Sequence, residues 1–561
     1  MIYLCLGILF HIFSGQTIPL NIELRPDMLP VESISPSMPL SWTSDKEECS
    51  MQYGLNLTSG CKYQWITEPD SGIDILVDCQ VLQNPYSVRM LVWDYQGKVI
   101  HIEEIGNAPC RIPLHVKIHG YGVYLITLDA IDKNGVWQSR LIRSVAALPD
   151  NSDLIDVWRS ENDYVVGSSF FPHRYGFWTG YKYSDMSADE AVNAIALLAQ
   201  RIGFQALRVD YKQANPFETE RMDTIVSILT NCNLKINFKL AAYTAANTEE
   251  PALSVWNGNI VAFVERYHNV AWLFEIGNEP AHTEFFDGDW DRYLILLTNA
   301  YLKIKEAVPS AVVVHGGLCP WDTAPTSRGY GWYTNFIKNA ALYNDSIAYH
   351  FHGTLADAEN SGWITDYKTL YQTAGGGNIP WVQTEGGVSL WRVYEDVHRT
   401  PLLLQKIFWS WASGDTGWIQ FALFQDISSS WANSDTKNWA IFNEATFCPK
   451  FPAGQLSALI NRFAGYTSGG ILYENDVLLL LKFNSSDERT SVVGFTKDGS
   501  VVNVNFILDD CAVTRSFDPQ GNCLSTTTDN VIIRDFSVYP CWIETAGNIL
   551  SLQINGIDIY L

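Results

Sequence analysis

The chain has 561 residues, of which 47% are hydrophobic and 13% aromatic, and its formal net charge is −24. This length predicts two or three domains, and the apolar content provides for a large core and excludes a disordered chain. The acidic balance argues against nucleic acid and anionic membrane surfaces as partners, because a phosphate-rich ligand requires a basic surface.

The N-terminus begins with an apolar run from Met1 to Ser14, followed by Gly15. The run is too short to span a bilayer and predicts a signal peptide over residues 1–17, although no Lys or Arg precedes it. An N-terminal buried strand is the alternative. No later segment has the length and apolarity of a membrane helix. We therefore expect a secreted, extracellular protein without a membrane span.

The cysteine content fits an oxidising compartment. The chain has 11 Cys, and without Cys5 of the signal peptide an even number remains. No Cys-x-x-Cys pair occurs, so disulfides are favoured over a zinc site, but their connectivity does not follow from sequence. Sequons at Asn56, Asn344 and Asn484 predict a glycoprotein.

Residues 18–160 show short strand patterns separated by turn residues. The run Asp132-Lys133-Asn134-Gly135 is a hairpin signal after the last of these strands. The pattern predicts an N-terminal β-sandwich-like domain. Examples of these strand candidates are Ile73–Val77, Val88–Trp93, Val99–Glu103 and Gly122–Asp129.

Residues 161–465 alternate strand patterns with helical ones. Ser187 and Glu190 form a capping box before a helix, and Thr400 with Pro401 predicts the start of a helix over Leu402–Ser413. Eight βα units predict an α/β fold, the (β/α)8 TIM barrel. A doubly wound open sheet is the alternative, but no Gly-x-Gly-x-x-Gly turn follows the first strand. The strand candidates are Tyr164–Phe170, Phe204–Val209, Leu234–Ala241, Val270–Ile276, Ala311–Gly316, Ser346–Phe351, Pro380–Thr384 and Gly417–Phe424.

Residues 466–561 return to strand patterns and predict a small C-terminal β-domain. The strand candidates there are Ile471–Tyr473, Val477–Phe483, Ser491–Thr496, Val501–Leu508 and Val531–Val538.

Two glutamates follow the fourth and seventh predicted barrel strands. Glu279 and Glu385 are 106 residues apart (385 − 279), which is close to three βα units of about 35 residues each. Active sites of such barrels lie at the carboxyl ends of the strands, and these two strands lie on opposite sides of the barrel mouth. Cleavage of a glycoside with retention requires two carboxyl groups about 5–5.5 Å apart. The pair therefore points to this chemistry.

With these motifs the chain resembles clan A of the glycoside hydrolases. Asn278-Glu279-Pro280 and Thr384-Glu385-Gly386 match the clan's motifs at the ends of strands four and seven. The resemblance covers the barrel only. It implies that Glu279 is the acid/base, that Glu385 is the nucleophile, and that Asn278 hydrogen-bonds the sugar 2-hydroxyl.

The resemblance also points to further residues of the cleft. Arg208, at the end of strand two, matches an arginine that contacts the nucleophile; a structural ion pair is the alternative. His350 matches a histidine that lines the subsite, while His352 stands where several families have Tyr. Either histidine could instead be a satisfied buried residue. Trp418 and Trp431 are candidates for a sugar platform, and core packing is the alternative for Trp418.

Other candidate residues give weaker signals. Glu275 lies inside strand four and is expected to be buried. The run from Asp287 to Asp291 lacks the later ligands of a calcium loop and reads as a solvated helix start.

The leading interpretation is a secreted retaining β-glycosidase of an oligo- or polysaccharide or glycoconjugate, acting by double displacement without metal or organic cofactor. The alternatives are a non-catalytic carbohydrate-binding protein on a glycosidase barrel, and an adhesion or structural protein. The sugar, endo or exo action and the oligomeric state do not follow from sequence.

Overall fold

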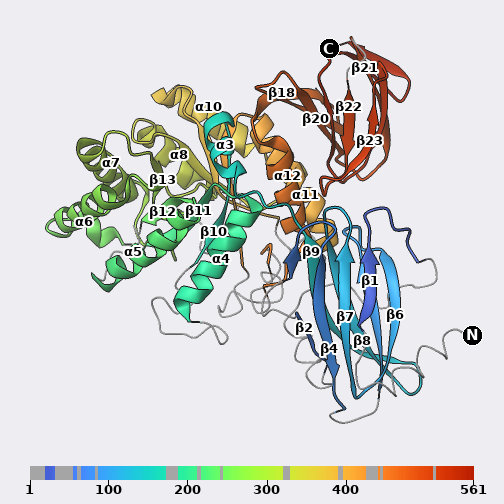
Figure 1. The fold of residues 1–561 in the computed structure, drawn as a ribbon. Helices are drawn as coiled ribbons and strands as arrows, with labels where there is room; N and C mark the ends of the chain where they lie inside the picture. Colours follow the sequence, from blue (N-terminus) through green and yellow to red (C-terminus); the bar gives the residue numbers. More distant parts are fainter. Residues whose placement is uncertain are drawn as a thin grey trace, which may run out of the picture.

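The computed structural model describes the chain over most of its length. The described residues are 19–31, 55–59, 65–81, 86–171, 187–211, 216–240, 244–319, 329–388, 396–424, 440–442, 447–509 and 513–560. The predicted signal peptide and Trp431 lie outside them. Along the chain the structure comprises a β-sandwich, a barrel with its helices, and a second pair of β-sheets (Figure 1).

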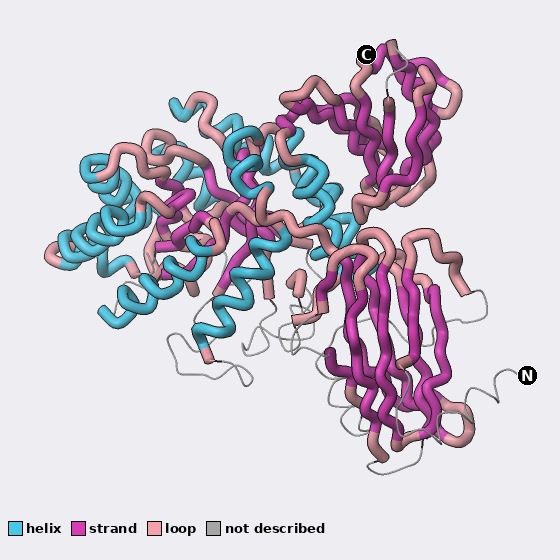
Figure 2. Tube along the Cα trace, in the orientation of Figure 1, coloured by secondary structure: helices cyan, strands magenta, loops and turns pink. Residues whose placement is uncertain are grey.

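The central part of the chain is a parallel barrel surrounded by helices, as Figure 2 shows by element type. Its strands follow the order β14-β13-β12-β11-β10-β17-β16-β15, with neighbours parallel. All eight predicted strands are present, which confirms the (β/α)8 prediction. They are β10 (Val165–Phe170), β11 (Ala206–Tyr211), β12 (Lys235–Leu240), β13 (Ala271–Ile276), β14 (Val313–His315), β15 (Ile347–Phe351), β16 (Trp381–Gly386) and β17 (Asp415–Gln420).

Two hydrogen bonds join the ends of this strand order. The Leu318 amide donates to Ala348 O at 3.0 Å, and the His350 amide donates to Leu318 O at 2.8 Å. Leu318 thereby forms a parallel bridge with Tyr349, just beyond the short strand β14. The barrel is closed at this seam by one residue pair, which brings the mouths of strands five and six together.

The helices pack their apolar faces onto the barrel. The Ser187 capping box is present, and Gly203 ends α4 with a φ of 92°, a conformation that glycine adopts without strain. The predicted N-cap at Thr400 is wrong, because α11 begins at Asp396 and contains Pro401. A proline this close to a helix start removes few intrahelical hydrogen bonds. The helices are α3 (Leu154–Glu161), α4 (Ala188–Ile202), α5 (Pro216–Asn231), α6 (Ala252–Tyr267), α7 (Trp290–Ala307), α8 (Gly329–Ala340), α9 (Leu355–Ser361), α10 (Trp363–Tyr371), α11 (Asp396–Ala412) and α12 (Phe451–Phe463).

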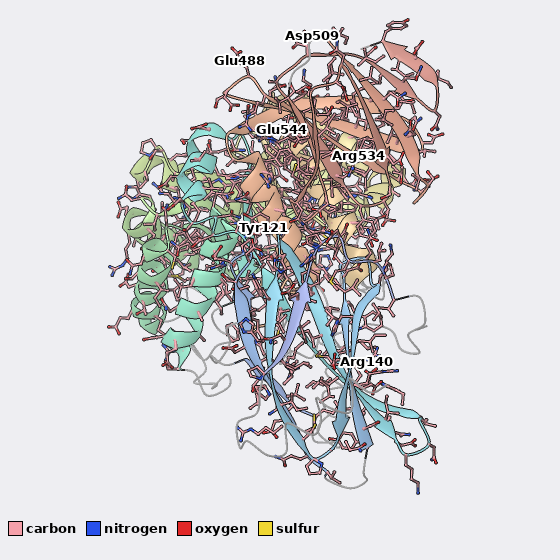
Figure 3. The ribbon with its side chains drawn as sticks, turned by 45° about the vertical axis from the view of Figure 1, so that its right-hand side comes forward. Tyr121, Arg140, Glu488, Asp509, Arg534 and Glu544 are labelled. Atoms are coloured by element: carbon pink, nitrogen blue, oxygen red, sulfur yellow. The ribbon has the colours of Figure 1, made fainter. Side chains whose placement is uncertain are left out.

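The N-terminal strands form two sheets, with orders β1-β7-β4-β2 and β3-β9-β8-β5-β6, around one apolar core. Inside this sandwich Arg140 and Asp129, both buried, form an ion pair with Nε–Oδ1 2.6 Å apart (Figure 3). The predicted hairpin after Gly122–Asp129 is present. The strands are β1 (Leu20–Leu24), β2 (Leu57–Ser59), β3 (Ile66–Thr67), β4 (Gly72–Cys79), β5 (Tyr86–Trp93), β6 (Val99–Asn107), β7 (Cys110–Ile118), β8 (Gly122–Asp132) and β9 (Trp137–Ala147).

The C-terminal strands also form two sheets, with orders β18-β19-β20-β25-β22-β23 and β24-β21-β26-β27. The first sheet packs on the barrel helices, where Phe483 lies 4.6 Å from Trp411, between ring centroids. The strands are β18 (Tyr466–Glu474), β19 (Leu478–Ser485), β20 (Thr490–Thr496), β21 (Val502–Leu508), β22 (Thr514–Phe517), β23 (Cys523–Thr527), β24 (Val531–Phe536), β25 (Cys541–Thr545), β26 (Ile549–Ile554) and β27 (Ile557–Tyr560).

The two β-domains also touch each other. Figure 3 shows Tyr121 where the sandwich meets the rest of the molecule. The Tyr121 amide donates to Asn522 Oδ1 at 2.8 Å, and Asn522 Nδ2 donates to the Tyr121 carbonyl at 2.9 Å. The three parts of the chain are therefore joined by specific contacts as well as by the chain itself.

The structure bears on three sequence predictions: disulfides, glycosylation sites and the absence of a membrane-spanning helix. No disulfide links any two of the described cysteines, so the predicted disulfides are not seen among them. Asn56 is exposed, but Asn344 is buried, and its side chain bonds the His315 amide and the Ala340 carbonyl. A glycan at Asn344 is therefore incompatible with this packing. Within the described residues, no helix combines the length and apolarity needed to cross a bilayer.

Candidate active site

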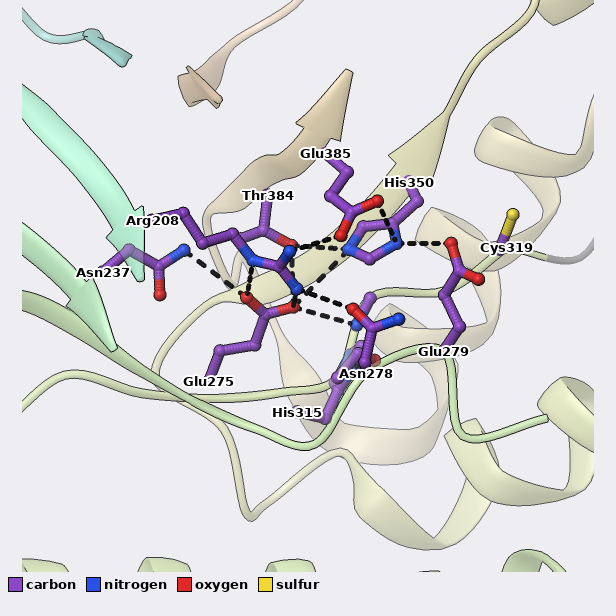
Figure 4. Close-up of polar contacts among 12 residues, drawn as sticks. Arg208, Asn237, Glu275, Asn278, Glu279, His315, Cys319, His350, Thr384 and Glu385 are labelled. Carbon is purple, nitrogen blue, oxygen red and sulfur yellow. Dashed lines mark hydrogen bonds and ion pairs between the residues drawn. The ribbon is translucent and has the colours of Figure 1, made fainter. Parts of the chain in front are cut away.

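The two predicted glutamates meet at the mouth of the barrel (Figure 4). Glu385 is the penultimate residue of β16, and Glu279 lies three residues beyond β13. An oxygen of Glu279 and an oxygen of Glu385 lie within 4.8 Å of each other. Both residues are almost completely buried, with exposed fractions of 8% and 7%. The pair thus lies together at the barrel mouth, largely shielded from solvent, as expected from their strands.

The backbone at Glu279 has an unusual conformation. Its φ is +33°, in the left-handed region that side-chain-bearing residues seldom adopt. The preceding Gly277, at φ +85°, reverses the chain at the end of β13. This turn directs the Glu279 side chain back over the barrel mouth. Strain of this kind gathers at functional sites, where the surrounding structure maintains it.

Arg208 on β11 joins the two carboxylates that face it. Its guanidinium donates to Glu275 through Nε (2.6 Å) and Nη2 (3.1 Å), and through Nη1 to Glu385. Nη2 also donates to the Asn278 oxygen at 2.8 Å. Arg208 therefore contacts Glu385 and also forms an ion pair with Glu275 inside the barrel. Glu275 is fully buried, as expected.

His350 lies at the centre of the cluster. Its Nδ1 is 2.7 Å from Glu279 Oε1 and 3.7 Å from Glu385 Oε2. Its Nε2 is 3.1 Å from Thr384 Oγ1, and that hydroxyl donates to Glu275 Oε1 at 3.0 Å. The imidazole, which has no exposed surface, is surrounded by three carboxylates. His350 therefore connects the two glutamates rather than only lining the cleft.

This arrangement sets the charges of the site. Burial disfavours the charged imidazolium of His350, but the surrounding carboxylates outweigh it and raise its pKa to about 9. Burial likewise opposes ionisation of Glu385, yet His350 and Arg208 hold its pKa well below the ordinary value. For Glu279, burial is outweighed by the His350 hydrogen bond, which lowers the pKa. Near neutral pH the proton of the His350–Glu279 pair therefore resides on the imidazole.

The other predicted substrate-binding residues, His352 and Trp418, differ in their distance from the two glutamates and in their burial. His352, which stands where several families have Tyr, lies close to Glu385, with Nε2 3.7 Å from Oε2. Trp418 has no exposed surface and its ring packs beside the Lys406 ammonium, 5.1 Å from the ring centroid. Its ring therefore belongs to the core in this structure and offers no face to a sugar. Trp431 lies outside the described residues.

Three residues of the site were missed by the sequence analysis. Thr384 bridges His350 and Glu275, while His282 and Cys319 lie beside Glu279. Cys319 and Thr384 satisfy the rule that polar residues at strand ends line the mouth of such a barrel. His282 carries no comparable signal, because it follows Glu279 in an irregular turn.

The comparisons with known proteins agree with this architecture. No protein-family model and no curated protein matches the chain. Among solved structures, it is similar to a family 39 glycoside hydrolase from the gut symbiont Bacteroides cellulosilyticus WH2. The TM-score is 0.61 at 14% identity, over 87% of this chain and 100% of the other. A glucosidase from Croceicoccus marinus matches with a TM-score of 0.49 at 12% identity, over 68% of this chain and 94% of that one.

The similarity to the family 39 enzyme extends beyond the barrel to the flanking β-domains, because it covers most of this chain and all of the other. At 14% identity, this similarity shows the fold alone. The chain therefore shares with that family 39 glycoside hydrolase a fold in which a (β/α)8 barrel has β-domains on either side.

Proposed function

We propose that the chain is a retaining β-glycosidase with Glu385 as nucleophile and Glu279 as acid/base. The observation that carries this proposal is the short separation of the two carboxylates, within 4.8 Å between oxygens. Retaining enzymes have carboxyl groups about 5–5.5 Å apart, whereas inverting enzymes need about 6.5–9.5 Å to admit a water. The separation of Glu279 and Glu385 favours direct attack by a carboxylate.

In the first step, a Glu385 oxygen attacks the anomeric carbon while the bond to the leaving oxygen breaks. That oxygen takes a proton from Glu279 and departs as an alcohol, and the sugar remains esterified to Glu385. In the second step, Glu279 removes a proton from water, which attacks the same carbon and releases Glu385. Two displacements return the sugar to its original anomeric configuration.

The proton on His350 is part of this scheme. Glu279 must carry a proton in the first step, although its pKa is lowered in the resting site. His350 Nδ1, 2.7 Å from Glu279 Oε1, can transfer its proton along that hydrogen bond. The Arg208 guanidinium and the His352 imidazole both help to keep Glu385 ionised for attack. We therefore assign the transferable proton to the His350–Glu279 pair.

The substrate is a carbohydrate whose non-leaving sugar carries a 2-hydroxyl. Arg208 donates to the Asn278 oxygen, which directs the Asn278 amide group to serve as the donor toward a sugar. Such a contact to the 2-hydroxyl strengthens as the transition state forms. We further propose that the enzyme acts outside the cell on a glycan, in keeping with the apolar N-terminal run and the exposed sequon at Asn56.

A panel of aryl β-glycosides and β-linked oligosaccharides tests the proposal. We expect hydrolysis of at least one substrate, with the first product in the β-configuration by proton NMR. Glu385→Gln should fold normally and lose several orders of magnitude in rate, because the amide is a poor nucleophile. An initial α-anomer, or a variant that keeps more than about a tenth of the rate, would refute the assignment.

A further inference from the structure

Three side chains of the kinds that bind metal ions lie together at the acid/base end of the carboxylate pair, and Glu279 is one of them. Glu279, His282 and Cys319 are all buried, and one ligand atom from each lies within 4.8 Å of those of the other two. Figure 4 shows Cys319 on the side of Glu279 away from His350. Glu279 therefore has His350 on one side and the Cys319 thiol on the other, with the His282 imidazole also close to it.

We propose that Glu279, His282 and Cys319 form an inhibitory site for Zn²⁺ or a similar borderline-soft divalent cation. Sulfur, imidazole and carboxylate ligands together suit Zn²⁺, whereas Mg²⁺ and Ca²⁺ prefer oxygen ligands alone. Three protein ligands leave the fourth position of a tetrahedral ion for water. The Glu279 side chain retains 11% exposure, so this ligand is not completely sealed from solvent.

The backbone holds the three ligands close to the required geometry. Glu279 O accepts the His282 amide at 2.8 Å, and this turn brings His282 Nε2 to 3.9 Å from Glu279 Oε2. Two oxygen or nitrogen ligands of one tetrahedral zinc are about 3.4 Å apart, given bonds of about 2.0–2.1 Å. The Cys319 amide donates to the Tyr333 hydroxyl at 3.0 Å, which fixes the third ligand's backbone.

Zinc binding has a direct consequence for the proposed reaction. The Cys319 thiol loses its proton to solvent as the S–Zn bond forms, and Glu279 binds as a carboxylate. A metal-bound Glu279 cannot give a proton to a leaving group or take one from water. The inhibition rests on the proposed glycosidase function, but the binding site itself does not.

Binding is measured first on the purified, metal-free full chain, without a substrate. Isothermal titration calorimetry with zinc chloride should give one tight site per chain. Cobalt chloride should produce the near-ultraviolet charge-transfer band of a thiolate–Co²⁺ bond. Cys319→Ser should abolish that band, and both Cys319→Ser and His282→Gln should weaken zinc binding by about tenfold or more. Magnesium chloride should not compete.

Matched controls use a cysteine and a histidine elsewhere in the barrel. Cys232→Ser removes another buried thiol, and His268→Gln removes a half-buried imidazole at the C-cap of α6. Both should bind zinc as the wild type does. An absent zinc site in the wild type, or one that survives Cys319→Ser and His282→Gln unchanged, overturns the proposal.

The kinetic measurement separates this proposal from the function. If the chain hydrolyses β-glycosides, zinc should inhibit the wild type and the controls, while Cys319→Ser should require about tenfold more zinc for the same fractional loss. Each variant is compared with its own zinc-free rate. A chain without glycosidase activity would refute the function and leave the calorimetric and cobalt results to decide the metal site.

Discussion

At the scale of single residues, the site depends on where one proton lies. His350 contacts Glu279 and lies near Glu385 and Glu275, so each carboxylate stabilises its imidazolium. The same contacts keep all three carboxylates ionised. A site with three carboxylates, Arg208 and one imidazolium carries a net charge near −1, and loss of the His350 proton would make it more negative.

The alkaline limb of the pH profile should report this proton. His350 has its pKa raised to about 9, so the pair keeps its proton below that pH and loses it above. We expect kcat/KM to fall as the pH rises through about 9, and the limb to move in His350→Gln. The measurement is kcat/KM against pH for both proteins. An alkaline limb that is the same in both would place the proton elsewhere.

Glu279→Ala should give a defect that depends on the leaving group. An aryl group of low pKa departs without a proton, so glycosylation of Glu385 should stay fast with dinitrophenyl glycosides and collapse with natural sugars. The second step lacks its base, and the covalent intermediate should accumulate. Azide needs no base and should restore turnover, giving a β-glycosyl azide by NMR. Without azide rescue, Glu279 would not be the acid/base.

At the scale of elements, α11 supports the active-site ends of β15 and β16. The Lys406 ammonium, which is buried, donates to Phe351 O at 2.7 Å and to Gly387 O at 2.6 Å. Phe351 directly follows His350, and Gly387 lies two residues beyond Glu385. Burial holds the pKa of Lys406 well below its ordinary value. Through this one side chain, α11 thus links the ends of β15 and β16.

Lys406→Met should therefore destabilise the barrel and misplace the site. Each buried carbonyl left without a donor costs about 1–3 kcal/mol, and two lose theirs. We expect a lower melting temperature by calorimetry and a larger loss in kcat than in KM. Lys303→Met is the control, because that lysine is exposed on α7 and its ion pair with Glu306 contributes little. Equal melting temperatures for the two variants would contradict the role of Lys406.

At the scale of the whole molecule, the barrel and the N-terminal sandwich share packing. Cys448 and Phe451, at the start of α12, belong to the apolar core of the sandwich. Ser144 on β9 also donates to the Pro449 carbonyl. Phe451 has no exposed surface, so separation of the two parts would expose a large aromatic ring. The two parts should therefore unfold together.

Phe451→Ala tests this coupling. Truncation of a buried Phe costs about 3–5 kcal/mol, and the loss should appear in a single transition that includes the barrel. Phe506→Ala in the separate core of the C-terminal sheets is the matched control. Differential scanning calorimetry, with residual activity after heating, should show barrel inactivation shifted by Phe451→Ala more than by Phe506→Ala. A barrel transition that Phe451→Ala leaves unmoved would show independent domains.

The local patterns of the sequence determined the fold class and the identity of the two glutamates. Alternation of strands and helices is a property of neighbouring residues, so all eight barrel strands were recognisable. Glu279 and Glu385 follow strand ends, and the closed barrel brings such ends together. The strands β22, β23, β25, β26 and β27 were missed, because short strands depend on distant pairing partners more than on their own composition.

Only the tertiary structure decided how the site works. The position of His350 between three carboxylates, the burial of Trp418, and the approach of Cys319 and His282 to Glu279 each depend on residues far apart in the chain. Protonation follows from the same cause, since a pKa is set by burial and by the charges that folding brings within a few ångströms. The sequence thus determined that Glu279 and Glu385 follow strand ends of a barrel, and packing determined which other groups join them, with their distances, exposure and charges.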